Sequence, residues 1–241
     1  MSTRRIGVLV IVESVLIFVP LIVLGVAINW PASLDDPAAV ALPRLSENEA
    51  AVRAGYLVYL GYSILFLPVA LAITRWTQGT GRSALSTAAL VAIGFATLSS
   101  GMRTIGILRW LSTMFPLAER WDQADAAEQT AIAVQFDALN AYGGAIGEVL
   151  GVSLFAALWV AVTALAPGRA DLPWWFRPTG ALVAVIVALP VIDLVGVDPG
   201  MLTTVGGTAI HLWLLAIGLT MLRSQQPATR AMAVAGGAPR P

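Results

Sequence analysis

Charged and titratable side chains inside long apolar stretches are the residues of this chain that could do chemistry. Glu13, Arg103, Glu148 and the single histidine, His211, all lie in such stretches. Carboxyl groups and imidazole rings exchange protons, whereas an arginine pairs with a carboxylate or holds an anion. A charged group inside a membrane is costly unless it meets a partner or water. These four residues are therefore the first candidates for a functional site.

A set of polar residues extends around Glu148. Asp137, Asn140 and Glu148 recur at helical spacing, so we expect them on one helix face. One interpretation is an ion pair between Arg103 and Glu148 that holds two helices together. The other is a polar pocket open to the outside, in which Arg103 or Arg109 engages an anionic group and a carboxylate takes a proton or a cation.

Gly143, Gly147 and Gly151 form a stripe of small residues beside that face. Such a stripe allows close helix approach, and we interpret it as packing. The contact could lie within the chain or across a homo-oligomer.

Glu13 and His211 are each considered alone. We expect Glu13 to face the interior of the helix bundle, because a carboxylate facing lipid would be uncompensated. No arginine is expected at its depth, so we expect it to be protonated, bonded to a hydroxyl group or facing water. For His211, a hydrogen-bonded place in the core is favoured over a role as proton relay.

The elements that must position these residues are six apolar stretches, each about 20 residues or longer and so long enough to cross a membrane. We predict an all-α, polytopic membrane protein with a six-helix transmembrane domain over residues 1–222 and a disordered tail over 223–241. The expected spans are 6–28, 54–74, 85–108, 139–166, 179–197 and 201–222.

The composition excludes several kinds of chemistry. The chain has no cysteine, no lysine and one histidine, so thiolate metal sites, Schiff-base chemistry and a bis-histidine haem are excluded. We predict no catalytic residue, no metal and no cofactor. The net charge of +0 argues against nucleic acid as a partner.

Arginines predict the orientation. Most of them fall on one side of the predicted spans, and the positive-inside rule makes that side cytoplasmic. We therefore expect a multi-pass protein of the cell membrane with both termini in the cytoplasm. The arginines on that side are Arg4, Arg5, Arg75, Arg82, Arg169, Arg177, Arg223, Arg230 and Arg240.

Two connections on the opposite side are long. Residues 29–53 are rich in proline and acidic side chains, and residues 109–131 carry Trp110, Phe115 and Trp121 among charges. We expect the second connection to lie in the membrane interface, as a short amphipathic helix. It is either a lid over an external cavity or a passive surface connection, and the second is favoured.

Several short motifs support a family resemblance. They are Arg109-Trp110, Phe115-Pro116-Leu117-Ala118, Leu139-Asn140-Ala141-Tyr142-Gly143-Gly144, Gly147-Glu148 and Gly151, with Arg5-Ile6-Gly7-Val8-Leu9 near the start. With these motifs the chain resembles the bacterial membrane family called "domain of unknown function 4386". The resemblance covers most of the chain and implies the six-span fold, with the shared feature in spans three and four. It implies no activity.

Three function classes remain. A binding, sensor or accessory protein with an outward-facing polar pocket between spans three and four is favoured, and it would hold a membrane lipid, a small molecule or a partner protein. The alternative is a small secondary transporter or ion-coupled carrier that uses intramembrane carboxylates. An intramembrane enzyme is less favoured, because no nucleophile or metal constellation is present.

Overall fold

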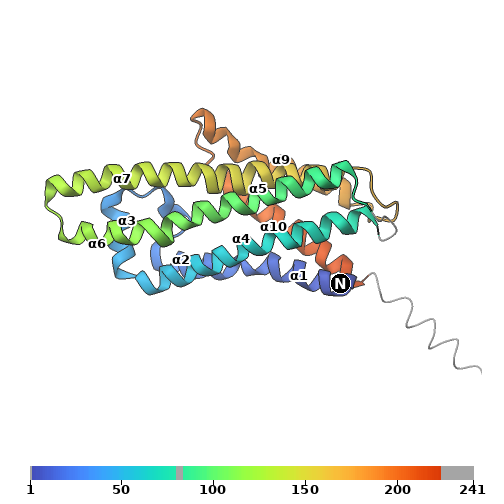
Figure 1. The fold of residues 1–241 in the computed structure, drawn as a ribbon, viewed down its shortest axis with the longest axis horizontal. Helices are drawn as coiled ribbons and strands as arrows, with labels where there is room; N and C mark the ends of the chain where they lie inside the picture. Colours follow the sequence, from blue (N-terminus) through green and yellow to red (C-terminus); the bar gives the residue numbers. More distant parts are fainter. Residues whose placement is uncertain (1, 80–83, 224–241) are drawn as a thin grey trace, which may run out of the picture.

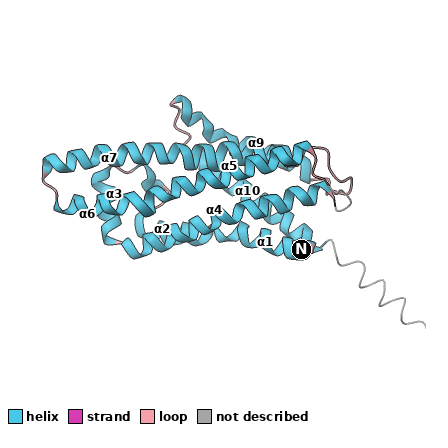
Figure 2. Ribbon diagram, viewed as in Figure 1, coloured by secondary structure: helices cyan, strands magenta, loops and turns pink. Residues whose placement is uncertain are grey.

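The structure is a computed structural model that describes residues 2–79 and 84–223. Within these ranges the regular elements are helices, and no strand occurs (Figure 2). In this described part of the chain, six helices are long and apolar enough to cross a membrane, which confirms the prediction of an all-α, six-span fold. Arg223 closes the last helix, whereas the rest of the predicted tail and Arg82 lie outside the described residues.

Several of the six spans are composites of successive helical segments. Two shorter helices, η1 (Ala32–Asp35) and α3 (Ala38–Glu47), follow the first span. The spans are α1 and α2 (Thr3–Leu16, Phe18–Ile28); α4 (Glu49–Gln78); α5, η2 and α6 (Thr87–Arg109, Trp110–Met114, Phe115–Gln123); α7, η3 and α8 (Ala126–Gly144, Ala145–Phe155, Ala156–Leu165); α9 and η4 (Phe176–Ala188, Leu189–Val195); and α10 (Leu202–Arg223).

The spans form one elongated bundle (Figure 1). Helix α5 packs against α4 on one side and against η3 and α8 on the other, while α1 packs along α10. The described ends of the chain, near Thr3 and Arg223, lie together at one end of the bundle, here called the terminal end. The α6–α7 turn lies at the opposite end, here called the head end.

Polar caps fix where the two longest spans begin. The hydroxyl of Ser86 accepts a hydrogen bond from the backbone N–H of Ala89 at the start of α5. Asp125 accepts from the N–H groups of Ala127 and Glu128 at the start of α7. Such caps satisfy N–H groups that the first helical turn leaves free.

A helical head projects at the head end, formed by α3, α6 and the first part of α7 (Figure 1). Its apolar side chains, among them Leu42, Leu117 and Ile132, are buried in one cluster. The third helix does not stop at the predicted span end near 108 but continues through η2 and α6 to Gln123. The segment expected to lie in the interface is therefore part of this hairpin.

Glycines bring α5 and η3 together. A Cβ atom on Gly106 would lie 2.5 Å from the Cα of Gly147, so the two backbones touch at this crossing. Gly143 and Gly151 flank the crossing and leave room for the side chains of Arg109 and Arg103 respectively. The glycine stripe thus packs against α5 within the chain.

Two π-helical segments lie next to this crossing. The five residues of η2 follow Arg109 directly, and the eleven residues of η3 contain Glu148. A π-helix turns less per residue than an α-helix, so side chains at α-helical spacing drift around the axis. Such segments often occur at functional sites.

Candidate functional site

An ion pair joins α5 to η3 at the head side of the glycine crossing. The Nη2 atom of Arg109 donates to Oε1 of Glu148 at 2.7 Å. The arginine side chain is 6% exposed and the carboxylate side chain is 37% exposed. The cation is therefore buried behind the carboxylate, which presents the open face of the pair.

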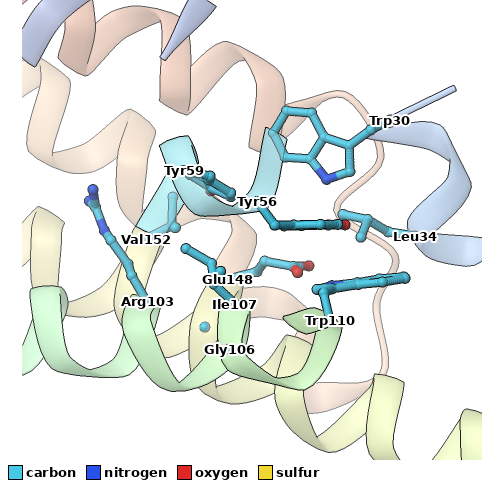
Figure 3. Close-up of a pocket in the computed structure, with 11 residues that line it drawn as sticks. Trp30, Leu34, Tyr56, Tyr59, Arg103, Gly106, Ile107, Trp110, Glu148 and Val152 are labelled. Carbon is cyan, nitrogen blue, oxygen red and sulfur yellow. The ribbon is translucent and has the colours of Figure 1, made fainter. Parts of the chain in front are cut away.

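The predicted pair of Arg103 with Glu148 is wrong. Among the described residues Arg103 forms no ion pair, and its guanidinium points away from Glu148 (Figure 3). The reason is geometric: helical side chains tilt toward the N-terminus of their own helix. Because α5 and η3 are antiparallel, Arg103 and Glu148 tilt apart, whereas Arg109 tilts back toward Glu148.

A small cavity, here called the head-side pocket, opens beside the carboxylate of Glu148. Its volume is about 20 Å³, which is room for about one water molecule. Most of its wall is aromatic or aliphatic (Figure 3). The lining residues are Trp30, Leu34, Tyr56, Tyr59, Arg103, Gly106, Ile107, Trp110, Gly147, Glu148 and Val152.

Ring packing fixes the walls of this pocket. Tyr56 stacks on Trp110 with ring centroids 5.2 Å apart, and Trp30 meets Tyr59 edge-on at 5.5 Å. The hydroxyl of Tyr56 is buried and has no hydrogen-bond partner among the described residues. Together with Glu148, it offers a polar group to an occupant of the pocket.

The first connection covers the head-side pocket. The side-chain amide of Asn140 donates to the backbone carbonyl of Leu34 at 2.7 Å, which ties η1 to α7. Asp137 is exposed and forms no ion pair within the described ranges. Of the polar face predicted on the fourth span, Glu148 thus lines the pocket, Asn140 holds its cover and Asp137 lies apart.

A second polar group, here called the buried cluster, lies deeper in the bundle and consists of Glu13, Tyr62, Arg103 and His211. Arg103 donates to the Tyr62 hydroxyl at 3.4 Å and lies 4.3 Å from the centre of the Phe66 ring. The Tyr62 hydroxyl and Nε2 of His211 are 2.8 Å apart. These contacts join α4, α5 and α10.

Glu13 lies inside the bundle, as the sequence analysis expected, with 0% of its surface exposed. Neither carboxyl oxygen has a hydrogen-bond partner among the described residues. The expectation that no arginine lies at its depth is wrong, because Arg103 acts on Glu13 electrostatically. The side chain of Arg103 extends toward the terminal end from a turn of α5 that lies nearer the head end, which brings its charge close enough to act on Glu13.

Arg103 connects the two sites. Its side chain lines the head-side pocket, while its guanidinium contacts Tyr62 in the buried cluster. A row of stacked rings also joins the two sites. Tyr59, which lines the pocket, stacks on Tyr62 with ring centroids 5.9 Å apart, and Tyr62 stacks on His211 at 5.7 Å. The pocket and the cluster are therefore adjacent parts of one polar region.

Reasoning from the sequence missed the aromatic residues of this region. Tyr56, Tyr59 and Tyr62 repeat every three residues on α4, a spacing that places them along one helix face. That repeat was the available signal. In the described part of the chain, no group of three or more His, Cys, Asp or Glu side chains could hold a metal ion.

Comparison with protein families gives a match over most of the chain. A family model described as "Domain of unknown function (DUF4386)" matches residues 6–218. The chain belongs to the DUF4386 family. The resemblance inferred from the motifs is thus confirmed, and the DUF4386 match includes every residue of both polar sites. No match was found among curated proteins or among solved structures.

Proposed function

We propose that this DUF4386 protein is a binding protein whose head-side pocket takes the primary ammonium group of an amine or an aminolipid. The observation that carries the proposal is the unequal exposure of the ion pair, in which Glu148 is 37% exposed and Arg109 only 6%. Of the two members of this pair, a ligand that enters the pocket therefore meets the carboxylate of Glu148 rather than the guanidinium of Arg109. A carboxylate accepts hydrogen bonds and binds a cation.

The walls and the size of the pocket support the same ligand class. Cations are attracted to the faces of tryptophan and tyrosine rings, and Trp30, Tyr56, Tyr59 and Trp110 line this pocket. A volume of about 20 Å³ suits a group about as large as water, such as –NH₃⁺, and excludes a trimethylated ammonium.

The expected orientation places this pocket at the outer surface of the cell membrane. Arginine bias puts the termini in the cytoplasm, so the head faces outside. Glu148 lies 17 residues (165 − 148) before Leu165, the end of the fourth span, or at most about 26 Å at 1.5 Å per residue. In a hydrocarbon core of about 30 Å, this depth brings the pocket close to the outer lipid headgroups.

The binding test compares lipids with and without a primary amine. Full-length protein is placed in phosphatidylglycerol nanodiscs that either contain or lack phosphatidylethanolamine, and retained lipid is counted by native mass spectrometry. Free ethanolamine is added in a third arm, which separates a lipid headgroup from a free amine. We expect a retained aminolipid, or a thermal stabilisation by ethanolamine, in the wild-type protein.

Two variants and a control make this test specific. Tyr56→Phe removes a hydroxyl that has no partner among the described residues, so the fold is kept while amine binding weakens. Glu148→Gln abolishes binding. Glu119→Gln changes an exposed carboxylate of the head and leaves binding unchanged. Equal retention of both lipids together with no effect of ethanolamine, or equal binding by all three variants, would refute the proposal.

An ion-coupled carrier is the second candidate. The observation in its favour is that Arg103 lines the pocket while its guanidinium belongs to the buried cluster. A ligand at Glu148 and a charge at Glu13 would then both act on one side chain. Uptake of labelled ethanolamine by proteoliposomes, driven by a pH gradient and lost in Glu13→Gln, is the expected result; uptake that ignores the gradient argues against coupling.

A further inference from the structure

The buried cluster contains a carboxyl group that the protein itself leaves without a partner. Both oxygens of Glu13 are buried and lack a hydrogen bond from any described residue, and 0% of the residue is exposed. Nε of Arg103 is likewise buried and unbonded. Buried polar groups of this kind require a proton, a water molecule or an ion.

A chain of hydrogen bonds joins Arg103, Tyr62 and His211 next to Glu13. Arginine only donates, so the Tyr62 hydroxyl accepts from Arg103. The backbone carbonyl of Gly207 only accepts, so Nδ1 of His211 carries a hydrogen and donates to it. In a neutral ring, Nε2 then accepts from the Tyr62 hydroxyl. Both ring nitrogens of His211 are therefore hydrogen-bonded, and Glu13 is the member of the cluster outside this chain of bonds.

Three of the neighbouring helices contribute titratable or charged groups near Glu13. Helix α4 contributes Tyr62, α5 contributes Arg103, and α10 contributes His211 behind Tyr62. Helix α2 has no titratable side chain. Because Arg103 is a permanent cation and no ion pair joins it to Glu13 within the described ranges, the carboxyl can exist in either protonation state without breaking a protein hydrogen bond.

We infer that the buried cluster is a proton-binding site at which Glu13 takes up and releases a proton. On release, the O–H bond of the carboxyl breaks, the proton passes to water, and the carboxylate left behind faces the guanidinium of Arg103. On uptake, a proton returns from water, the O–H bond forms again, and a neutral carboxyl group lies near the guanidinium of Arg103. This inference holds whether or not the head-side pocket takes an amine.

Infrared difference spectroscopy tests the inference on full-length protein in nanodiscs. Spectra recorded at a series of pH values are subtracted, and the C=O stretch of a protonated carboxylic acid is followed. We expect a band that disappears as the pH rises, that shifts with ¹³C-labelled glutamate and that is absent from Glu13→Gln. Glu119→Gln, on the exposed head, keeps the band.

Arginine variants identify the partner charge. Arg103→Gln changes the pH at which the band is lost, whereas Arg120→Gln, which alters an exposed arginine of the head, does not. If Glu13→Gln fails to fold, the isotope shift in the wild-type protein and the Arg103→Gln spectrum still decide the matter. A band that survives in Glu13→Gln, or one that is present unchanged at every pH, overturns the inference.

Discussion

Arg103 and Arg109 lie on the same helix less than two turns apart, yet the structure places them in contrasting surroundings. Arg109 touches a carboxylate that is partly exposed. Arg103 is 3% exposed, and its guanidinium contacts the Tyr62 hydroxyl and the ring of Phe66. It acts on the carboxyl group of Glu13 electrostatically, without an ion pair among the described residues. A contact pair is held by its own Coulomb energy, whereas a separated pair depends on what lies between its members. The first site is therefore built for structure and access, and the second for a change of charge.

The largest loss of stability is expected at the contact between Gly106 and Gly147, because this crossing of α5 and η3 positions both polar sites. Gly106→Ala would put a Cβ atom 2.5 Å from the backbone of Gly147, so the helices must separate, at about 3 kcal/mol or more of stability. Gly101→Ala, on the same helix, meets nothing within 4 Å and should stabilise by about 0.5 kcal/mol. Thermal unfolding in one detergent measures both. Equal losses would show that the crossing does not organise the sites.

Breaking the contact pair from either side should give unequal losses. Glu148→Gln leaves Arg109 buried and unpaired and should cost about 3 kcal/mol. Arg109→Gln should cost less, because the remaining carboxylate side chain is 37% exposed. A double-mutant cycle by thermal unfolding should find a coupling of about 1 kcal/mol or more. The same cycle with Arg103→Gln and Glu148→Gln should be nearly additive, and strong coupling there would restore the pair expected from the sequence.

Two tyrosines on α4 provide a matched comparison of the two sites. Tyr62→Phe removes the hydrogen bonds to Arg103 and His211 and should destabilise by about 1 to 2 kcal/mol. Tyr56→Phe removes a hydroxyl without a partner in the described ranges and should leave the melting temperature unchanged. Comparable losses in both variants would mean that the Tyr56 hydroxyl is also satisfied.

The smallest effect is expected at the exposed ion pair of Arg169 with Asp171, which serves as a reference for the sites of Arg109 and Arg103. A hydrogen bond from Arg169 lowers the pKa of Asp171 below its usual range. The folded state therefore gains stability above the ordinary aspartate pKa of about 4, and loses it as the pH falls through the lowered value. The melting-temperature difference between wild type and Asp171→Asn should be small at pH 6 and should decrease further as the pH falls through the lowered pKa of Asp171. High salt should reduce it as well.

The sequence predicts the fold well because hydropathy alone requires the spans. The ends of the first, fifth and sixth predicted spans fall within three residues of those in the structure. The head was missed because α6 mixes apolar and charged residues, as a helix lying in the interface does. Hydropathy does not distinguish that helix from the continuation of a span beyond the membrane.

The sequence analysis named most of the residues that the structure brings together, but it paired Glu148 with the wrong arginine. Arg103, Arg109, Glu148, Glu13 and His211 all lie in the two polar sites. The wrong pair came from comparing residue depths alone, which ignores the tilt of each side chain along its helix. The π-helical turns of η3 also alter the face on which Asp137 and Glu148 would coincide. The spacing of residues in the sequence shows neither the side-chain tilt nor the π-helical turns.

The third and fourth spans, with 37 and 40 residues, are far longer than the about 20 residues that a bilayer requires. Hydrophobic mismatch therefore cannot fix the position of these two helices along the membrane normal, because each can shift along that axis without bringing a helix end into the lipid. The shorter fifth and sixth spans, of 20 and 22 residues, must set it. In a thicker bilayer the head would be drawn toward the lipid surface and the head-side pocket would sink below the headgroups, so membrane thickness itself would control access to Glu148.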